Sequence, residues 1–212
     1  MEEKLKDYAK SMVILYRMLH KRGYIIPEDK HERSLEDTIT YMKQPGTTEK
    51  QRCSVANCDL TITCFRAGPV KDHIMVFFLR DSKVTAGKFN ECIGQVRDQD
   101  ATRCVLVIGG EMTPSALKLA RAFDDLVTLE VFYEEEVLFD ITEHNLQPEF
   151  RVLTEEETEE LLKEYEISVY QLPAISKADP IARFYGLDPK QVIKITRKNQ
   201  VSGSYYTYRV CI

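Results

Sequence analysis

Between residues 59 and 132 the spacing of the apolar residues changes back and forth between the period of a strand and that of a helix. Two strands come first, an alternating one around Ile62 and, after a turn at Gly68-Pro69, a continuous apolar run over residues 74–79 that is typical of an interior strand. A helix over 86–97, a strand over 104–108, a helix beginning at Thr113-Pro114 and a strand over 127–132 follow. Alternating strands and helices favour parallel pairing through right-handed crossovers. We therefore predict an α/β domain over residues 1–139, with a mostly parallel sheet flanked by helices.

Two helices precede this alternation. The first is predicted from apolar residues that recur at gaps of three and four and form one stripe, which is typical of a core-facing helix: Leu5, Tyr8, Met12, Leu15 and Leu19. Gly23 follows Lys21 and Arg22, as expected of a residue that ends a helix in the left-handed conformation. Ser34 is the expected N-cap of a second helix that ends before the turn at Pro45-Gly46.

The pattern changes after Asp140. Thr154 and Glu157 form a capping-box sequence, and the helix that they open is predicted to turn Leu161, Leu162 and Tyr165 inward. A short helix over residues 179–186 follows, with Asp179 as the expected N-cap, Pro180 at the first helical position and Gly186 closing it. Two strands over 191–196 and 204–210, joined by a turn at Ser202-Gly203, complete the chain. Residues 140–212 are therefore predicted to form a small α+β domain.

The charge balance excludes some classes of function. The chain has 29 basic and 34 acidic residues, a net charge of −5, which is unfavourable for a protein that binds nucleic acid on its own. The charges are unevenly distributed, because residues 177–212 contain seven Lys or Arg and two Asp. No apolar stretch is long enough to span a membrane, and the amino terminus lacks the apolar region of a secretory signal. We expect an intracellular protein without a membrane partner.

The sequence shows no motif for a metal or a cofactor. The six cysteines, at positions 53, 58, 64, 92, 104 and 211, include no pair at the close spacing of zinc ligands, and the four histidines are scattered. Gly109-Gly110 precedes Glu111 and lacks the lysine of a phosphate-binding loop. We predict no cofactor, no metal and no catalytic residue, with the cysteines present as thiols in a reducing compartment.

One fragment permits an enzymatic alternative. Asp81 and Lys83 form an acidic-x-Lys triplet directly after the predicted strand over 74–79, where metal-dependent nucleases hold their metal and activate water. The further carboxylate that such a site needs would be Asp59 or Asp72. A polar turn after a strand is the simpler interpretation of the triplet, and the nuclease hypothesis is kept as the alternative.

The carboxyl half resembles a known family. The resemblance lies in residues 141–146, 153–157, 161–162, 171–173, 179–186, 191–195, 202–205 and 207–209, and it continues upstream in residues 20–24, 76–78 and 112–116. These segments resemble the fifth-largest subunit of nuclear RNA polymerases, which is shared by RNA polymerases I, II and III. The carboxyl half is also similar to a subunit of the archaeal RNA polymerase. The sequence departs from the family pattern at Phe150, Ala174 and residues 199–201.

The resemblance implies a particular architecture and role. It implies an amino-terminal jaw domain over residues 1–139 at the downstream DNA channel, and a carboxyl-terminal assembly domain over 140–212. The assembly domain would dock on the largest subunit, and the chain would be a non-catalytic subunit that acts in the nucleus. This agrees with the absence of a catalytic motif.

Two sets of residues are the predicted contacts. The surface that meets the largest subunit is predicted from the family segments and the local positive charge, and its residues are Gln171, Leu172, Pro173, Asp179, Pro180, Arg183, Tyr185, Gly186, Tyr205, Tyr208 and Arg209. Arg183 is the expected anchor, since its planar guanidinium can form two hydrogen bonds to a carboxylate or to backbone carbonyls. The alternative is an ion pair between Arg183 and Asp179 on the same helix.

The second set is predicted to contact downstream duplex DNA. Thr113, Pro114 and Ser115 begin a helix, so backbone N–H groups and the positive end of its dipole should meet there. Lys118 and Arg121 follow on the same helix. We expect one phosphate contact at this helix end, which would position the duplex without reading its sequence.

Overall fold

The protein is described by a computed structural model, in which residues 2–27, 30, 34–43, 61–66, 72–79, 81–124, 127–144, 146–199 and 203–212 are placed. The features predicted at Pro45-Gly46, Gly68-Pro69, Cys53, Cys58, Asp59, Ser202 and residues 200–201 lie outside these ranges. The chain divides into two compact units, Met1–Phe139 and Asp140–Ile212, and each has its own sheet.

The first unit is built on a five-stranded sheet. Its strands lie in the order β1 (Tyr24–Ile25), β2 (Thr61–Arg66), β3 (Asp72–Leu79), β5 (Arg103–Ile108) and β7 (Thr128–Tyr133). The pairs β3–β5 and β5–β7 are parallel, but β1–β2 and β2–β3 are antiparallel. The prediction of a mostly parallel sheet is therefore wrong for half of the strand pairs. The connection between β2 and β3 is too short for the crossover of about a dozen residues that parallel pairing requires.

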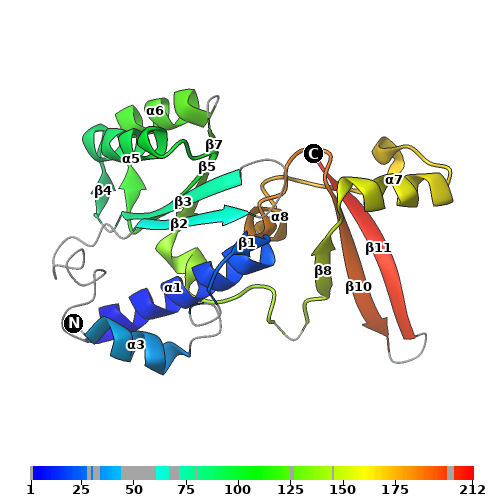
Figure 1. Cartoon of the computed structure of the whole chain (residues 1–212), viewed down its shortest axis with the longest axis horizontal. Coiled ribbons are helices and arrows are strands. Elements are labelled where there is room, and N and C mark those ends of the chain that lie inside the picture. The colour runs from blue at the N-terminus through cyan, green and yellow to red at the C-terminus, as the bar shows by residue number, and fades with distance from the viewer. Residues whose placement is uncertain are drawn as a thin grey trace. The chain divides into compact units, whose positions relative to one another are not determined.

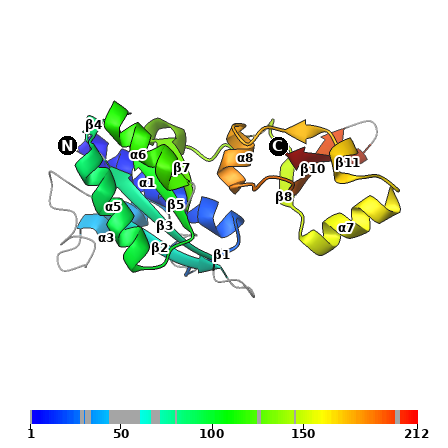
Figure 2. The same ribbon diagram turned by 90° about the horizontal axis from the view of Figure 1, so that it is seen from above.

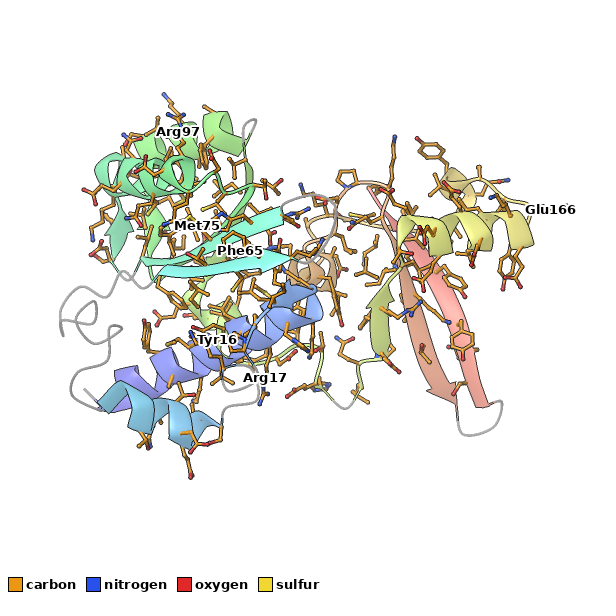
Figure 3. The ribbon with its side chains drawn as sticks, in the orientation of Figure 1. Tyr16, Arg17, Phe65, Met75, Arg97 and Glu166 are labelled. Carbon is orange, nitrogen blue, oxygen red and sulfur yellow. The ribbon has the colours of Figure 1, made fainter. Side chains whose placement is uncertain are left out.

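Helices cover both faces of this sheet (Figures 1 and 2). Helices α5 (Ala86–Asp98) and α6 (Pro114–Asp124) lie on one face, while α1 (Glu2–Lys21) and α3 (Leu35–Lys43) lie on the other. Strand alternation sends Met75, Phe77 and Leu79 into a core with α5 and α6. On the opposite face the ring of Phe78 lies 5.5 Å from that of Tyr8 on α1. Figure 3 shows Met75 and Tyr16 on these two sides of the sheet.

The predicted stripe of the first helix is core. Tyr8, Met12, Leu15 and Leu19 are all buried, and the side chain of Leu5 is outside the described part. Gly23 has φ +86°, the left-handed conformation expected of the residue that ends the helix. These two predictions are confirmed.

A small feature of the first unit was not predicted. Strands β4 (Lys83–Val84) and β6 (Glu111–Met112) form a parallel two-stranded sheet between the ends of β3 and β5 and the starts of α5 and α6. A Cβ atom at Gly110 would lie 2.2 Å from the carbonyl oxygen of Ser82. Because Gly110 has no side chain, the connection from β5 to β6 can approach the connection from β3 to β4. The 3-10 turn η1 (Glu134–Val137) follows β7.

The second unit contains a four-stranded sheet in the order β8 (Glu149–Val152), β10 (Val192–Asn199), β11 (Gly203–Cys211) and β9 (Ala174–Ile175). Strands β8, β10 and β11 are antiparallel neighbours, and β9 is parallel to the end of β11. Helix α7 (Glu155–Glu164) packs on one face through Leu161, Val192 and Val210. Helix α8 (Pro180–Tyr185), which follows the 3-10 turn η2 (Val169–Gln171), packs on the other face.

The capping predictions in this unit are confirmed. The Glu157 N–H donates to the Thr154 hydroxyl over 3.2 Å, and the Thr154 N–H donates to the Glu157 carboxylate over 3.0 Å. The Asp179 carboxylate accepts from the Ile181 N–H at 2.8 Å, with Pro180 at the first helical position. Tyr165 was predicted to point inward, which is wrong, because it is 57% exposed. It is the C-cap residue that follows the last turn of α7, so helical periodicity no longer determines which way its side chain points.

Candidate functional site

The predicted docking residues come together on the second unit around α8 and the end of β11. Pro173 accepts a hydrogen bond from the Val210 N–H at 2.9 Å, which joins residues 171–173 to the strand that carries Tyr205, Tyr208 and Arg209. Helix α8 reaches the same strand, because Ile181 and Ala182 pack with Cys211. Segments far apart in the sequence thus form one region of the unit.

This region has two faces rather than one. Alternation along β11 puts Tyr205 and Arg209 on the face covered by α8, and Tyr208 on the face covered by α7. The prediction that the helix and the strands form a single surface is therefore wrong for Tyr208. The pKa of Tyr208 is raised, first by burial and then by the nearby Tyr165 and Glu164, both of which belong to the α7 side.

Several docking candidates have structural roles within the unit. The Gln171 side-chain oxygen accepts from the Ser168 N–H at 2.7 Å and caps the short turn η2. The Tyr185 hydroxyl donates to the Phe150 carbonyl at 3.3 Å, and burial raises the pKa of Tyr185 to about 12. Gly186 has φ +61° and ends α8, and Leu172 packs in the α7 core. Pro180 is exposed and Arg183 is half-buried.

Sequence reasoning missed one cation of this unit. The ammonium group of Lys194 on β10 lies 3.9 Å from the ring centre of Tyr206. Arg151, on the neighbouring strand β8, forms an ion pair with Glu157 of the capping box. The pKa of the Glu157 carboxyl is lowered, chiefly by the hydrogen bond that it accepts from the Thr154 backbone N–H. The alternation of charged and aromatic residues in the two strands was the available signal for this arrangement.

The start of α6 differs in part from the predicted phosphate site. Thr113 is its N-cap, with the hydroxyl accepting from Ala116 at 3.3 Å and the carbonyl accepting from Leu117 at 2.9 Å. Pro114 has no N–H, so among the first four helical residues the Ser115 N–H is the donor that remains. The expectation that several unpaired N–H groups meet there is wrong, because the N-cap already bonds two of them.

The side chains of the predicted DNA contacts are nevertheless accessible. Pro114, Ser115, Lys118 and Arg121 are exposed, and Thr113 is half-buried. Positions 114, 118 and 121 lie on one face of the helix, because their spacings are four and three. Glu111 and Lys83 lie opposite each other in the adjoining β4–β6 pair. The helix therefore presents two cations on its outer face.

The residues proposed for a nuclease site are not assembled. Asp72 begins β3 and Asp81 follows its end, so the strand separates them by roughly 25 Å at its usual rise per residue. Asp81 forms an ion pair with Lys88, whereas Lys83 is exposed. Asp59 lies outside the described residues. This geometry gives the nuclease hypothesis no support.

Asp72 has a structural role instead. Its carboxylate accepts from the hydroxyls of Tyr24 at 3.1 Å and Thr102 at 3.0 Å, and it pairs with Arg66 at 3.3 Å. Arg103 lies 3.8 Å away. Asp72 therefore joins β1, β2 and β5 at one end of the sheet.

The described cysteines are Cys64, Cys92, Cys104 and Cys211, and all four are buried free thiols. Burial raises the pKa of Cys64 to about 11 and also raises that of Cys104 and Cys211. Within the described ranges, no group of three or more His, Cys, Asp or Glu could hold a metal ion. Among the same residues no helix is both long and apolar enough to cross a membrane.

Comparison with known proteins defines the class of the second unit. The family described as "RNA polymerase Rpb5, C-terminal domain" matches residues 139–211, which include all of this unit except its last residue. The chain is thus related to a class of RNA polymerase subunits.

The relatives extend the similarity to both units. The chain is 36% identical over 92% of its length to "DNA-directed RNA polymerases I, II, and III subunit RPABC1" of Caenorhabditis elegans, and covers 91% of that protein. It is 38% identical to the subunit of the same name in Dictyostelium discoideum, over 74% of this chain and 81% of the relative. It is 29% identical to "DNA-directed RNA polymerase subunit 5-like protein 1" of Arabidopsis thaliana, over 100% of this chain and 99% of the relative. The chain belongs to the RPABC1 family of DNA-directed RNA polymerase subunits.

Proposed function

We propose that the chain is the non-catalytic subunit shared by RNA polymerases I, II and III, and that it acts in the nucleus. The observation that carries this proposal is the similarity over both units to relatives that bear this name. The alternative of a nuclease has no support, because Asp72 and Asp81 lie at opposite ends of β3 and Asp81 pairs with Lys88. The active site of the enzyme would lie in other chains.

The two units are proposed to have different roles. We propose that the unit Met1–Phe139 serves as the lower jaw at the downstream DNA channel, and that Asp140–Ile212 is the assembly domain that docks on the largest subunit. The excess of basic residues in the last part of the chain favours a partner surface that is acidic or mixed.

Purification of the polymerase through a tag on this chain tests the proposal. Mass spectrometry of the co-purifying proteins is expected to find the largest subunits of all three enzymes. Recovery of one enzyme alone would identify a specialised paralogue, and recovery of none would overturn the proposal.

The docking contact is tested at Arg183. Arg183 is a half-buried residue of α8, and the Asp179 carboxylate caps the same helix by accepting from the Ile181 N–H. Arg183→Ala is expected to lower the amount of chain that enters the polymerase. The matched control is Lys163→Ala on α7, where the lysine side chain is 79% exposed. Equal incorporation of both variants would contradict a docking role for Arg183.

The DNA contact is tested inside the assembled enzyme. A photoreactive group at Ser115 is expected to crosslink downstream duplex, and Lys118→Ala with Arg121→Ala is expected to weaken the crosslink. Arg97→Ala is the control, because Arg97 is an exposed cation in the last turn of α5, away from the start of α6. Each phosphate contact adds only about −0.9 to the slope of the logarithm of the binding constant against the logarithm of the salt concentration. One or two such contacts bind weakly, so the isolated subunit should show little affinity for DNA. No crosslink in the intact wild-type complex would rule the site out.

A further inference from the structure

Strand β11 is the longest strand of the second sheet, and one of its edges is open over most of its length (Figure 1). Its other edge pairs with β10 from Gly203 to Val210. On the open side, β9 pairs only with Val210 and Cys211. In the part of the chain that the structure describes, no strand pairs with residues 203–209 of β11 on this open side.

The hydrogen bonds at the end of β11 show which backbone groups face this open edge. The Val210 N–H points toward β9 and donates to Pro173 at 2.9 Å, whereas the Cys211 N–H points the other way and donates to Gln191 at 2.9 Å. Backbone groups alternate in direction along a strand. The N–H and C=O groups of Ser204, Tyr206 and Tyr208 therefore point to the open edge.

Strand β8, at the opposite edge of the same sheet, is partly covered. On β8, the Phe150 carbonyl accepts a hydrogen bond from the Tyr185 hydroxyl of α8 at 3.3 Å. The outer side of β8 is thus partly covered by a residue of its own unit. The backbone of Ser204 and Tyr206 has no such cover among the described residues.

The sequence of the open edge also favours pairing. Proteins protect exposed edge strands with charges, prolines or bulges, since an unprotected edge pairs with other chains. Residues 204–208 read Ser-Tyr-Tyr-Thr-Tyr, without a charge, a proline or a glycine, and they are rich in residues that favour strands. Tyr205 and Tyr206 are 45% and 56% exposed.

The charges beside this edge indicate what would bind there. Arg209 lies on β11 itself and donates to the Ala174 carbonyl at 3.5 Å, and Arg197, across from Tyr205 on β10, lies on the same face of the sheet but one strand farther from the open edge. Arg197 is exposed, and the described residues contain no ion pair to either arginine. An added strand with acidic side chains on this face would be attracted by both cations, with Arg209 the nearer of the two.

We infer that β11 docks an extended acidic segment of another polymerase chain, which adds to the sheet as a fifth strand along Ser204–Tyr208. This inference rests on the proposed function, since the partner is a chain of the same assembly. Backbone hydrogen bonds would hold the segment, and the two arginines would select acidic residues on the α8 face.

Two substitutions of one residue separate backbone pairing from side-chain contact. Tyr206→Pro removes the N–H that points to the open edge and leaves the bonds to β10, which come from the neighbouring residues. Tyr206→Thr removes the same ring and its contact with Lys194 but keeps the N–H. Both variants are first compared with the wild-type chain by circular dichroism and thermal unfolding.

The readout is the amount of each tagged full-length chain that co-purifies with the polymerase. Tyr206→Pro is expected to lower incorporation at least about tenfold, and Tyr206→Thr by no more than about threefold, because only the proline removes a backbone hydrogen bond and adds a ring that blocks the incoming strand. Equal incorporation of Tyr206→Pro and wild type would overturn the inference, and so would equal losses in the two variants. Failure of the wild-type chain itself to co-purify would instead overturn the proposed function.

Amide hydrogen exchange gives a second measurement that does not depend on a variant. Exchange at residues 204, 206 and 208 is expected to slow at least about tenfold in the assembled polymerase relative to the free chain. Unchanged exchange would contradict strand addition. If the free wild-type chain forms a dimer and Tyr206→Pro abolishes that dimer, the partner at this edge is a second copy of the chain, and the inference of another polymerase chain is overturned.

Discussion

At the scale of single residues, the first unit depends on a buried ion pair. The Arg22 guanidinium, at the end of α1, donates to both oxygens of Glu130 on β7 at 2.9 and 2.6 Å. Their side chains are 1% and 14% exposed. This pair joins the first helix to an edge strand more than a hundred residues away in the sequence.

Removing one partner should be costly. Glu130→Ala is expected to lower the free energy of unfolding by about 3 kcal/mol, because it leaves the Arg22 charge buried without a carboxylate. The measurement is urea unfolding of the full chain. Lys10→Ala is the control, since Lys10 and Asp7 form an exposed pair at 3.4 Å whose loss should cost less than about 1 kcal/mol. Equal costs for the two variants would contradict the role given to the buried pair.

Tyr185 should make stability fall at high pH. Burial raises its pKa from 10.0 to about 12, so above pH 10 the unfolded chain loses this proton while the folded chain keeps it. Its contribution is fully present below pH 10 and is lost between pH 10 and pH 12. Tyr185→Phe is expected to be slightly less stable at pH 7, for want of the bond to Phe150, but to lose less stability on going to alkaline pH. If the free energy of unfolding of the wild type and of Tyr185→Phe fell by the same amount between pH 7 and pH 12, this prediction would be wrong.

At the scale of elements, local signals specified the ends of helices well. Thr154, Asp179, Gly23 and Gly186 were all identified from the sequence, because a cap depends on residues within one turn of each other. The same locality explains the error at Tyr165. It follows the last turn of α7, so helical periodicity no longer fixes where its side chain points.

The connection between β5 and β6 provides a test of close approach. Gly110→Ala is expected to destabilise the first unit by about 2 kcal/mol, because its Cβ would lie 2.2 Å from the Ser82 carbonyl oxygen and the backbone must move. Gly94→Ala is the matched control. No atom lies within 4 Å of a Cβ there, so this change in the middle of α5 should stabilise by about 0.5–1 kcal/mol. Thermal unfolding of both variants checks the opposite signs.

At the scale of the whole molecule, the second unit has the elements of an independent domain. It contains its own sheet, with α7 on one face and α8 on the other, and a separate set of core residues for each face. The two cores share strands β10 and β11. This arrangement does not need the first unit to bury its apolar side chains.

A fragment of residues 140–212 is therefore expected to fold alone. Its size is near the lower limit for a single core, so its stability should be modest, on the order of 3–5 kcal/mol. Circular dichroism against temperature should show one cooperative transition. A broad, non-cooperative loss of signal would mean that the second unit needs the first or a partner chain.

The sequence by itself determined the order and type of the longer helices and of strands β2, β3, β5, β7, β10 and β11, together with the caps, the core stripe of α1 and the family. These depend on the spacing of residues close together in the chain, or on motifs that can be read directly. Only the tertiary structure decided the direction of β2, the pairing of β4 with β6 and the use of Asp72 as an internal partner for two arginines. It also separated Tyr208 from Tyr205 and Arg209, and it left one edge of β11 open. These features depend on which distant segments become neighbours, because strand pairing and burial are set by the packing of the whole unit rather than by any local pattern.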